Sequence, residues 1–400
     1  MADKPELLSP AGDMERLMMA LQYGADAVYL AGRQFGMRAS AANFADDQLR
    51  EAVRIAHRHG ARIHVTCNTL PIEDELKQLP DYLGFLQDAG VDALIIADLG
   101  VLELAKRYAP RLARHVSTQL GVINSATANA LYALGADTVV LARETRLEDI
   151  CKIRANTPPE LRLEAFVHGA MCVSFSGRCL LSNYMTGRDA NRGQCAQPCR
   201  WKYHLVEETR PGEYFEITED GGTHILNSRD MRMIEHISEL LEAGVSSFKI
   251  EGRMKSAYYT AIITNAYRQA IDAAVAGIAL DPVWVEETEK VSHRPYSTGF
   301  YFGQPGQYYP DSMYDSTAEV MAVVESCDSI GNAVLTQRNK FRRGDILELV
   351  RPGEKAVSFA VDQMFDAEGA EIEDTRRAMM EIHLKLPCSA PPYSILRKSK

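Results

Sequence analysis

The sequence predicts an α/β fold: a TIM-like (β/α)8 barrel with a cysteine-bearing insertion after its seventh strand, followed by a small C-terminal all-β barrel domain. Three observations predict it. An apolar, β-rich run follows each helical pattern, eight such runs lie between residues 1 and 280, and short β runs separated by turns replace this pattern from residue 301. The chain has 400 residues, of which 46% are hydrophobic, which suffices for two or three domains.

A short repeat marks the junction between each helix and the strand after it. It reads Tyr-Gly-Ala-Asp-Ala-Val-Tyr-Leu at residues 23–30, Ala-Gly-Val-Asp-Ala-Leu-Ile-Ile at 89–96 and Leu-Gly-Ala-Asp-Thr-Val-Val-Leu at 134–141. The glycine suits the end of a helix, and the run after it suits a buried strand. This alternation is typical of a parallel sheet covered by helices.

The barrel needs eight strands, and the sequence offers eight. We expect them at residues 6–8, 27–31, 62–67, 93–97, 115–119, 138–142, 162–168 and 246–251. Amphipathic patterns at residues 13–23, 46–59, 72–89, 229–243 and 256–276 predict helices, with Asp13 and Asp46 as N-caps. Eight units favour a closed barrel. An open doubly wound sheet is the alternative, but no glycine-rich phosphate motif follows the first strand.

Two segments depart from the repeat. Residues 170–227 form an insertion between the seventh and eighth strands, and an insertion after a barrel strand lies at the end where barrel active sites are found. We therefore expect it to cover the barrel mouth, within a catalytic domain of residues 1–280. Residues 281–300 suggest a linker, and residues 301–400 suggest a small β-barrel that could contact RNA.

Four of the eight cysteines lie in the insertion, as Cys172, Cys179, Cys195 and Cys199. Four thiolates can bind zinc or an iron–sulfur cluster. The wide C-x6-C-x15-C-x3-C spacing differs from the tight pairs of structural zinc sites and favours a cluster, with zinc or unligated thiols as alternatives.

Ionisable residues lie on the two strands that flank the insertion. The two-residue period of a strand places Glu164 and His168 on one face of the seventh strand, and Lys249 and Glu251 on one face of the eighth. Arg253 follows directly. Because these strands are neighbours in a closed barrel, we expect the five side chains to converge at its mouth. An internal ion-pair network is the alternative to a functional site.

Other strand ends contribute further polar candidates. Asn68, Gln119 and Arg143 lie at the ends of the third, fifth and sixth strands and join Lys249 and Arg253 as candidate substrate-binding residues. His115 is expected to be a surface or packing residue.

The charge pattern leaves room for a local RNA contact. The net charge of −10 argues against a protein that coats nucleic acid through its overall field. Residues 188–204 and 337–343 are nevertheless basic and contain aromatic rings, a combination that suits RNA, although solvated turns would look the same. The basic candidates are Arg188, Arg192, Arg200 and Lys202 in the first segment and Arg342 and Arg343 in the second. No stretch suits a membrane span or a signal peptide, so we expect a cytoplasmic protein.

Several motifs together resemble the peptidase U32 (collagenase-like) family along the whole chain, most closely its tRNA-hydroxylating branch. They are Leu-Leu-Ser-Pro-Ala-Gly at residues 7–12, Glu-Ala-Phe-Val-His-Gly-Ala-Met-Cys at 164–172, Gly-Arg-Asp-Ala-Asn-Arg-Gly-Gln-Cys at 187–195, Cys-Arg-Trp-Lys-Tyr at 199–203 and Phe-Lys-Ile-Glu-Gly-Arg at 248–253.

The resemblance implies an enzyme that makes 5-hydroxyuridine at the tRNA wobble position, with prephenate as partner metabolite and a [4Fe–4S] cluster. It implies Cys172, Cys179 and Cys195 as cluster ligands. Some relatives place a further cysteine where this chain has Arg232, so Cys199 becomes the expected fourth ligand. This difference also disfavours the ubiquinone-hydroxylating branch of the family.

The resemblance also gives the polar candidates roles. Arg253, Lys249 and Arg143 are expected to hold the two carboxylates of prephenate. His168 or Glu251 is expected to move the proton lost from C5, with Glu164 as a further catalytic candidate.

Two other functions remain as alternatives. The family label suggests a peptidase, but the sequence has neither a G-x-S-x-G elbow nor an H-E-x-x-H helix. A nucleophilic pair of Cys172 and His168 is the remaining way to a peptidase. A non-catalytic RNA-binding module is the other alternative, and the polar barrel interior argues against it.

Overall fold

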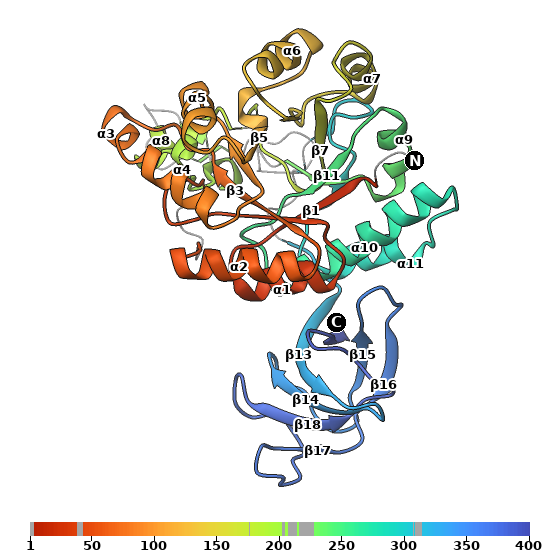
Figure 1. The fold of residues 1–400 in the computed structure, drawn as a ribbon. Helices are drawn as coiled ribbons and strands as arrows, with labels where there is room; N and C mark the ends of the chain where they lie inside the picture. The colour runs from red at the N-terminus through yellow and green to blue at the C-terminus, as the bar shows by residue number, and fades with distance from the viewer. Residues whose placement is uncertain are drawn as a thin grey trace.

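A computed structural model describes residues 4–37, 43–175, 177–201, 205–206, 214–215, 228–306, 308 and 314–400. Within them, helices surround a central parallel sheet, and a second unit of strands lies beyond α1 and α10 (Figure 1). No helix in these ranges combines the length and apolar character that crossing a membrane requires.

The central sheet is a closed barrel. Its parallel strands are β1 (Glu6–Pro10), β2 (Ala27–Leu30), β3 (Arg62–Cys67), β4 (Ala93–Ile96), β5 (Ala113–Val116), β6 (Thr138–Val140), β7 (Arg162–Ala170) and β11 (Ser247–Ile250). Each strand pairs with the next, and β11 pairs with both β7 and β1. The predicted (β/α)8 barrel is therefore confirmed, and the open sheet is excluded.

The helices largely follow the predicted pattern. They are α1 (Met14–Gln22), α2 (Asp46–Arg58), α3 (Glu73–Leu76), α4 (Leu79–Asp88), α5 (Leu99–Tyr108), α6 (Ser125–Ala133), α7 (Leu147–Ala155), α9 (Ile237–Glu242), α10 (Ala257–Ala276) and α11 (Val283–Glu287). Asp13 caps α1 by accepting a hydrogen bond from the backbone of Arg16.

Three details of the helices differ from the prediction. The N-cap of α2 is Ala45, and Asp46 is already the first helical residue. The helix expected over residues 72–89 is two helices, with Pro80 in the first turn of the second. The helix expected from residue 229 begins only at Ile237, because β10 (Asp230–Arg232) pairs antiparallel with the end of β7.

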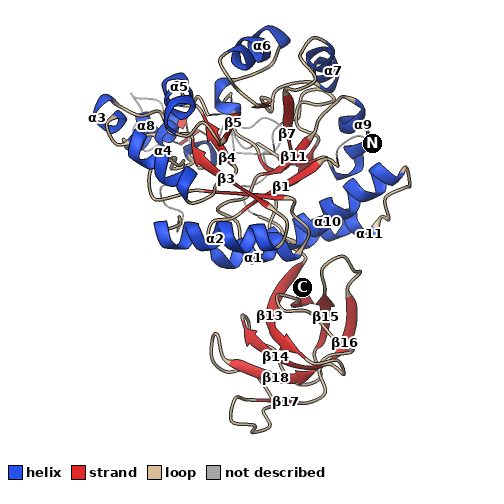
Figure 2. Cartoon of the chain, viewed as in Figure 1, coloured by secondary structure: helices blue, strands red, loops and turns tan. Residues whose placement is uncertain are grey.

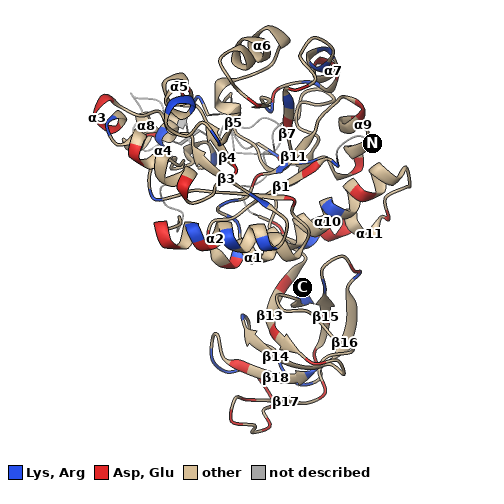
Figure 3. Ribbon diagram, viewed as in Figure 1, with Lys and Arg blue, Asp and Glu red and all other residues tan. Residues whose placement is uncertain are grey.

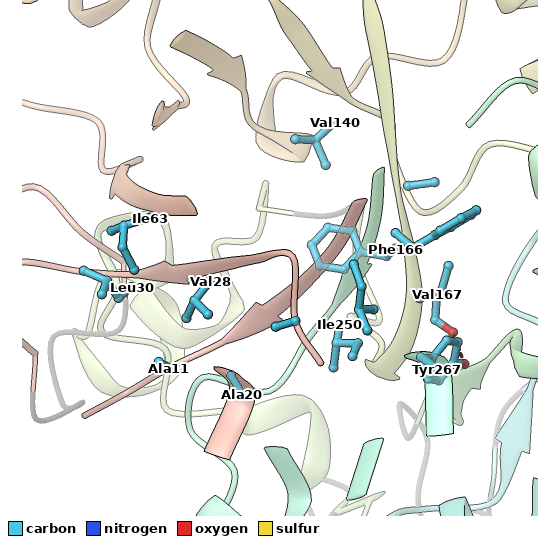
Figure 4. Close-up of a cluster of buried hydrophobic side chains, with 14 of the residues drawn as sticks. Ala11, Ala20, Val28, Leu30, Ile63, Val140, Phe166, Val167, Ile250 and Tyr267 are labelled. Carbon is cyan, nitrogen blue, oxygen red and sulfur yellow. Dashed lines mark hydrogen bonds between the residues drawn. The ribbon is translucent and has the colours of Figure 1, made fainter. Parts of the chain in front are cut away.

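The main core lies between the strands and the helices. In Figure 4, Leu30 and Ile63 of neighbouring strands lie together, and Val167 of β7 lies against Tyr267 of α10. All four side chains are fully buried. The outward faces of the strands thus hold the helices, which leaves the inward faces free for polar residues.

The C-terminal unit is a single antiparallel sheet, drawn as red strands in Figure 2. It has its own hydrophobic core. Its strands are β13 (Ala318–Cys327), β14 (Asn332–Gln337), β15 (Ile346–Val350), β16 (Val357–Ala360), β17 (Met364–Phe365), β18 (Glu381–Lys385) and β19 (Ile395–Ser399). The strand order is β16-β15-β19-β13-β14-β18-β17. The predicted all-β domain is confirmed as an open half-barrel, because its outer strands β16 and β17 do not pair in the described part of the chain.

A buried ion pair joins the two domains. Arg397 of β19 is fully buried, and its Nη2 lies 2.6 Å from Oε1 of Glu287 in α11, while its Nε lies 2.7 Å from Oε2 of Glu348 in β15. The intervening chain is also structured, because β12 (Tyr296–Ser297) pairs with β10 beside the barrel. The orientation of the second domain is therefore fixed by charge as well as by packing.

Candidate active site

A cavity opens at the carboxyl ends of the barrel strands, as the fold class leads one to expect. It brings together most of the residues that the sequence singled out. They are Asn68, Gln119, Arg143, Lys249, Glu251 and Arg253 from the strand ends, and Cys172, Cys179, Cys195 and Cys199 from the insertion. The four cysteines and the polar barrel residues thus line one space.

The floor of the cavity carries a buried ion pair. Nζ of Lys249 lies 2.6 Å from Oε1 of Glu164, and Glu164 is fully buried one layer below the cavity. Burial alone would raise the pKa of Glu164, but the charge of Lys249 and the adjacent His115 outweigh burial and hold that pKa well below its usual range. Glu164 is therefore ionised at rest and orients Lys249.

The wall of the cavity holds a second carboxylate. Oε2 of Glu251 lies 3.5 Å from Nη2 of Arg143 and accepts a hydrogen bond of 3.4 Å from the Tyr29 hydroxyl. Arg143 also stacks over the Phe166 ring at 4.0 Å and donates to the backbone oxygen of Ala170. Arg143 is therefore held in place by groups that the chain itself supplies.

The remaining polar candidates are also fixed in position. Nη1 of Arg253 donates to the Thr66 hydroxyl at 3.1 Å. The side-chain amide of Gln119 donates to the backbone oxygen of Asn68, and the Asn68 amide donates back to the Gln119 side chain at 2.9 Å. Asn68 and Gln119 thus form a rigid amide pair at the rim.

His168 does not lie at the mouth, contrary to the prediction. The register between β7 and β11 shifts between Lys249 and Ile250, so Lys249 faces Phe166 while Ile250 faces His168. Such a bulge adds one residue to β7 and reverses which face the next side chain occupies. The His168 ring therefore lies outside the barrel, with Nδ1 3.2 Å from the Tyr267 hydroxyl.

The insertion is fastened to the barrel rim. Arg178 donates to the backbone oxygen of Gln119 at 3.1 Å. Arg192 forms a two-point ion pair with Glu75 of α3 and also donates to the backbone oxygen of Leu70. Within the insertion, the short helix α8 (Leu181–Thr186) packs beside the cysteines. These contacts hold the four thiols over the cavity.

The four thiols are free and close enough to influence one another. Burial raises the pKa of Cys199. The charge of Arg200 lowers this pKa, and the neighbouring cysteines Cys172, Cys195 and Cys179 raise it. The backbone N–H of Leu181 points at Sγ of Cys179, and that of Gln197 points at Sγ of Cys195, each at 3.4 Å. Backbone N–H groups aimed at sulfur are characteristic of metal-bound thiolates.

The basic candidates of the insertion have different surroundings. Arg188 is exposed. Arg192 is committed to Glu75, and Arg200 donates to the Tyr314 hydroxyl at 2.7 Å. Lys202 lies outside the described residues.

The basic segment of the second domain is not a free positive patch. Arg343 faces Glu371, Glu373 and Asp362 at 3.3 to 3.9 Å, and the backbone of Arg342 donates to Asp345. Figure 3 likewise shows acidic and basic residues interspersed along the outer helices in this view. The positive charge expected at residues 337–343 is therefore largely balanced by neighbouring carboxylates.

Sequence reasoning missed two histidines inside the barrel. His64 and His115 are buried beside Glu164, with Nδ1 of His115 3.4 Å from Oε2 of that carboxylate. His115 was expected to be an ordinary surface or packing residue. The available signal was strand parity, since His64 and Thr66 share the inward face of β3, and Thr66 lines the cavity.

Comparison with known proteins identifies similar chains. Residues 12–309 match the model of peptidase family U32, and residues 316–397 match the model of the peptidase family U32 C-terminal domain. The chain is 37% identical over 404 residues to tRNA hydroxylation protein P1 of Bacillus subtilis, covering 99% of this chain and 95% of that protein.

Two further relatives match a shorter stretch of the chain. One is an uncharacterized protease of Methanocaldococcus jannaschii, 45% identical over 302 residues, covering 74% of this chain and 73% of the relative. The other is a 23S rRNA 5-hydroxycytidine synthase of Escherichia coli, 39% identical over 310 residues, covering 75% of this chain and 46% of the relative.

Proposed function

The chain belongs to peptidase family U32, and we propose that it is an enzyme that hydroxylates RNA, specifically tRNA. The observation that carries the proposal is the cavity in which four cysteines face Lys249, Glu251 and Arg253. Relatives named for hydroxylation of tRNA and of 23S rRNA support this chemistry. A tRNA substrate implies a cytoplasmic enzyme.

The tRNA assignment rests on the extent of similarity. The tRNA hydroxylation protein matches 99% of this chain, including the C-terminal domain, whereas the rRNA relative matches 75%. We propose uridine at the wobble position as the target and C5 as the atom hydroxylated. An unpaired anticodon base can be turned out of its stack into a cavity at low cost, as base-modifying enzymes require.

The four cysteines fit a [4Fe–4S] cluster. The donor set is Cys172, Cys179, Cys195 and Cys199, all free thiols on one side of the cavity. When bound there, a cluster would supply one-electron redox chemistry beside the substrate. Zinc is the alternative occupant of the same thiols.

Prephenate, a dicarboxylate, is the proposed partner metabolite. Three cations, Lys249, Arg143 and Arg253, surround the cavity against two carboxylates, Glu164 and Glu251. All three cations line the same cavity, so together they are the proposed clamp for the two carboxylates of this metabolite.

The remaining residues suit positioning and proton transfer. Glu251 replaces His168 as the proposed base for the C5 proton, because Glu251 lines the cavity and His168 does not. Lys249 provides a fixed positive charge at the floor. The insertion covers the cavity and limits the access of water.

The peptidase alternative loses its nucleophilic pair. Cys172 lines the cavity, whereas the His168 ring lies outside the barrel between Tyr267 and Tyr296. A histidine in that place does not activate the thiol. A relative named as a protease still makes a peptidase assay a necessary comparison.

The test is nucleoside mass spectrometry of tRNA from cells that lack this protein and receive it on a plasmid. The unaltered protein should restore 5-hydroxyuridine derivatives, and Glu251→Gln should not. The matched control is Glu242→Gln, an exposed position on α9, which should restore them fully. Unchanged tRNA with the unaltered protein, or peptide cleavage by it, would contradict the proposed function.

A further inference from the structure

One layer of the barrel interior consists entirely of ionisable side chains. In a (β/α)8 barrel the interior is filled by layers of four side chains from alternate strands, usually branched and apolar. Here strands β1, β3, β5 and β7 contribute Glu6, His64, His115 and Glu164, each at most 3% exposed. The layer above it, toward the cavity, contains Lys249 and Tyr29, which line the cavity floor.

The four side chains form a ring across the barrel. Glu164 faces His115 at 3.4 Å, and the His115 and His64 rings meet edge to face with their centres 4.6 Å apart. Nε2 of His64 lies 4.0 Å from Oε2 of Glu6. Ser247 closes the ring, because its hydroxyl donates to Glu6 at 2.8 Å and lies 3.4 Å from Glu164.

The ring connects the cavity with the opposite end of the barrel. On the cavity side, Glu164 accepts a hydrogen bond from Lys249. On the other side, Glu6 pairs with Arg62 and lies 3.9 Å from Arg162. The side chain of Arg62 is 46% exposed and that of Arg162 is 33% exposed. The ring therefore reaches from the cavity floor to residues in contact with solvent.

Strands β2, β4, β6 and β11 contribute the next layer, on the side of the ring away from the cavity. That layer consists of small side chains, namely Ala27, Ala93, Thr138 and Ser247. The hydroxyl of Thr138 is buried without a hydrogen-bond partner among the described residues. Small side chains and an unsatisfied hydroxyl suit the entry of water from this end.

The charges favour a proton over a metal ion as the occupant of the ring. Two histidines and a carboxylate with donor atoms within 4.8 Å of one another could bind a divalent cation. Both carboxylates, however, already face cations: Glu164 faces Lys249, and Glu6 faces Arg62. A divalent ion would add two positive charges where one proton adds a single charge.

The histidines are suited to accept and pass on that proton. Burial and the neighbouring His115 hold the pKa of His64 well below its usual range, so its ring is neutral at rest. Nδ1 of each ring has no hydrogen-bond partner among the described residues. An imidazolium formed on either ring would lie near a carboxylate, which stabilises it.

We propose that Glu164, His115, His64 and Glu6 form a proton relay between the cavity floor at Lys249 and solvent at the amino-terminal end of the barrel. Its role in turnover rests on the proposed function, since replacing C5–H by C5–OH releases the hydrogen of C5 while RNA and the insertion cover the mouth. Each transfer breaks one N–H or O–H bond and forms another, and no electrons are exchanged.

The first test needs no substrate. Hydrogen exchange of the His64 and His115 ring protons is followed by NMR on the full chain with 15N-labelled histidine. We expect these protons to exchange at least tenfold faster than backbone amides of the same strands, and Glu6→Gln to slow the exchange at least tenfold. Glu242→Gln, the same change at an exposed position on α9, should leave it unchanged. Ring protons as protected as the amides would overturn the relay.

The second test measures turnover. His115→Gln and Glu6→Gln should lower kcat for tRNA hydroxylation at least tenfold and increase the solvent isotope effect, with KM for tRNA unchanged. If both variants keep the kcat and the solvent isotope effect of the unaltered protein, the relay has no role in catalysis. If the unaltered protein does not hydroxylate tRNA, the proposed function fails, whereas the exchange test still decides the relay. Zinc that remains in Cys172→Ser but is lost in His115→Gln would overturn the relay in favour of a metal site.

Discussion

Gly169 lies so close to Glu251 that residue 169 has no room for a side chain. A Cβ there would stand 2.4 Å from the backbone oxygen of Glu251 and 2.9 Å from its Cβ, and the backbone of Gly169 has a φ of +112°. Gly177 stands in a similar relation to Gln119, where a Cβ would lie 2.3 Å from the side chain. Glycine thus allows both ends of the cavity wall to close tightly.

Gly169→Ala should destabilise the barrel by about 2 kcal/mol or more, because it combines backbone strain with a clash against Glu251. It should also reduce hydroxylation, since the clash displaces the proposed base. Gly60→Ala is the matched control, with a φ of +73° and open space around it. Thermal unfolding of both variants measures the two contributions, because both positions have a positive φ and only Gly169 has close neighbours. Equal losses of stability in the two variants would show that the contact with Glu251 is unimportant.

Cys172→Ser should remove bound iron and labile sulfide, about four of each per chain in protein purified without oxygen. The physical reason is that one of four thiolate ligands is lost. Cys327→Ser, in the second domain, should change neither. Metal and sulfide analysis with a visible spectrum decides the outcome. Zinc in place of iron, or metal retained in Cys172→Ser, would contradict the proposed cluster.

Arg188→Glu should weaken tRNA binding and reduce the slope of log Kd against log salt by about 1, as expected for the loss of one phosphate contact. Arg343→Glu should have a smaller effect, because Arg343 already faces three carboxylates. Binding titrations at several salt concentrations compare the two. A larger effect of Arg343→Glu would place the RNA on the second domain.

The sequence predicted most barrel strands well because β2, β3, β4, β6 and β11 are each short apolar runs that follow a glycine. Such local signals survive folding. It failed where a single residue changes the geometry. The register shift after Lys249 moves His168 out of the barrel, and strand parity contains no sign of a bulge. His115 is the first residue of the expected strand and shares its face with Gln119, so strand parity alone could have placed it inside the barrel.

Charge partners were harder to predict than strands. The basic run around Arg343 is evident in the sequence, but the Glu371 that faces it lies 28 residues away. The same holds for Lys249 and Glu164, which are 85 residues apart. Their pairing follows from barrel closure, so it could be expected once β7 and the last barrel strand were recognised as neighbours.

Glu287→Gln should lower the stability of the domain junction by about 3 kcal/mol at pH 7, because it leaves the charge of Arg397 buried without its main partner. Burial alone would raise the pKa of Glu287, but the hydrogen bonds and charge of Arg397 outweigh it and lower that pKa. The carboxylate therefore stabilises the fold fully above its unfolded pKa of about 4.3 and loses this effect as pH falls through the lower folded pKa.

Urea unfolding from pH 7 to pH 3 measures this difference. The unaltered chain should lose stability in acid more steeply than Glu287→Gln, so the two curves should converge. Glu286→Gln, an exposed neighbour, should follow the unaltered chain. Parallel curves for Glu287→Gln and the unaltered chain would mean that this carboxylate does not control the acid response.

The pairing of Glu287 with Arg397 also has a consequence for synthesis. The two residues are 110 positions apart, so at roughly 5–20 residues per second the ribosome releases Glu287 roughly ten seconds before Arg397. During that interval the barrel strands can already pair, but Glu287 of α11 lacks its partner Arg397, which has not yet been synthesised. The packing of α11 is therefore completed only when β19 has been made, and loss of this strand, which pairs with β13 and β15, would leave Glu287 without Arg397 as well as disrupting the second domain.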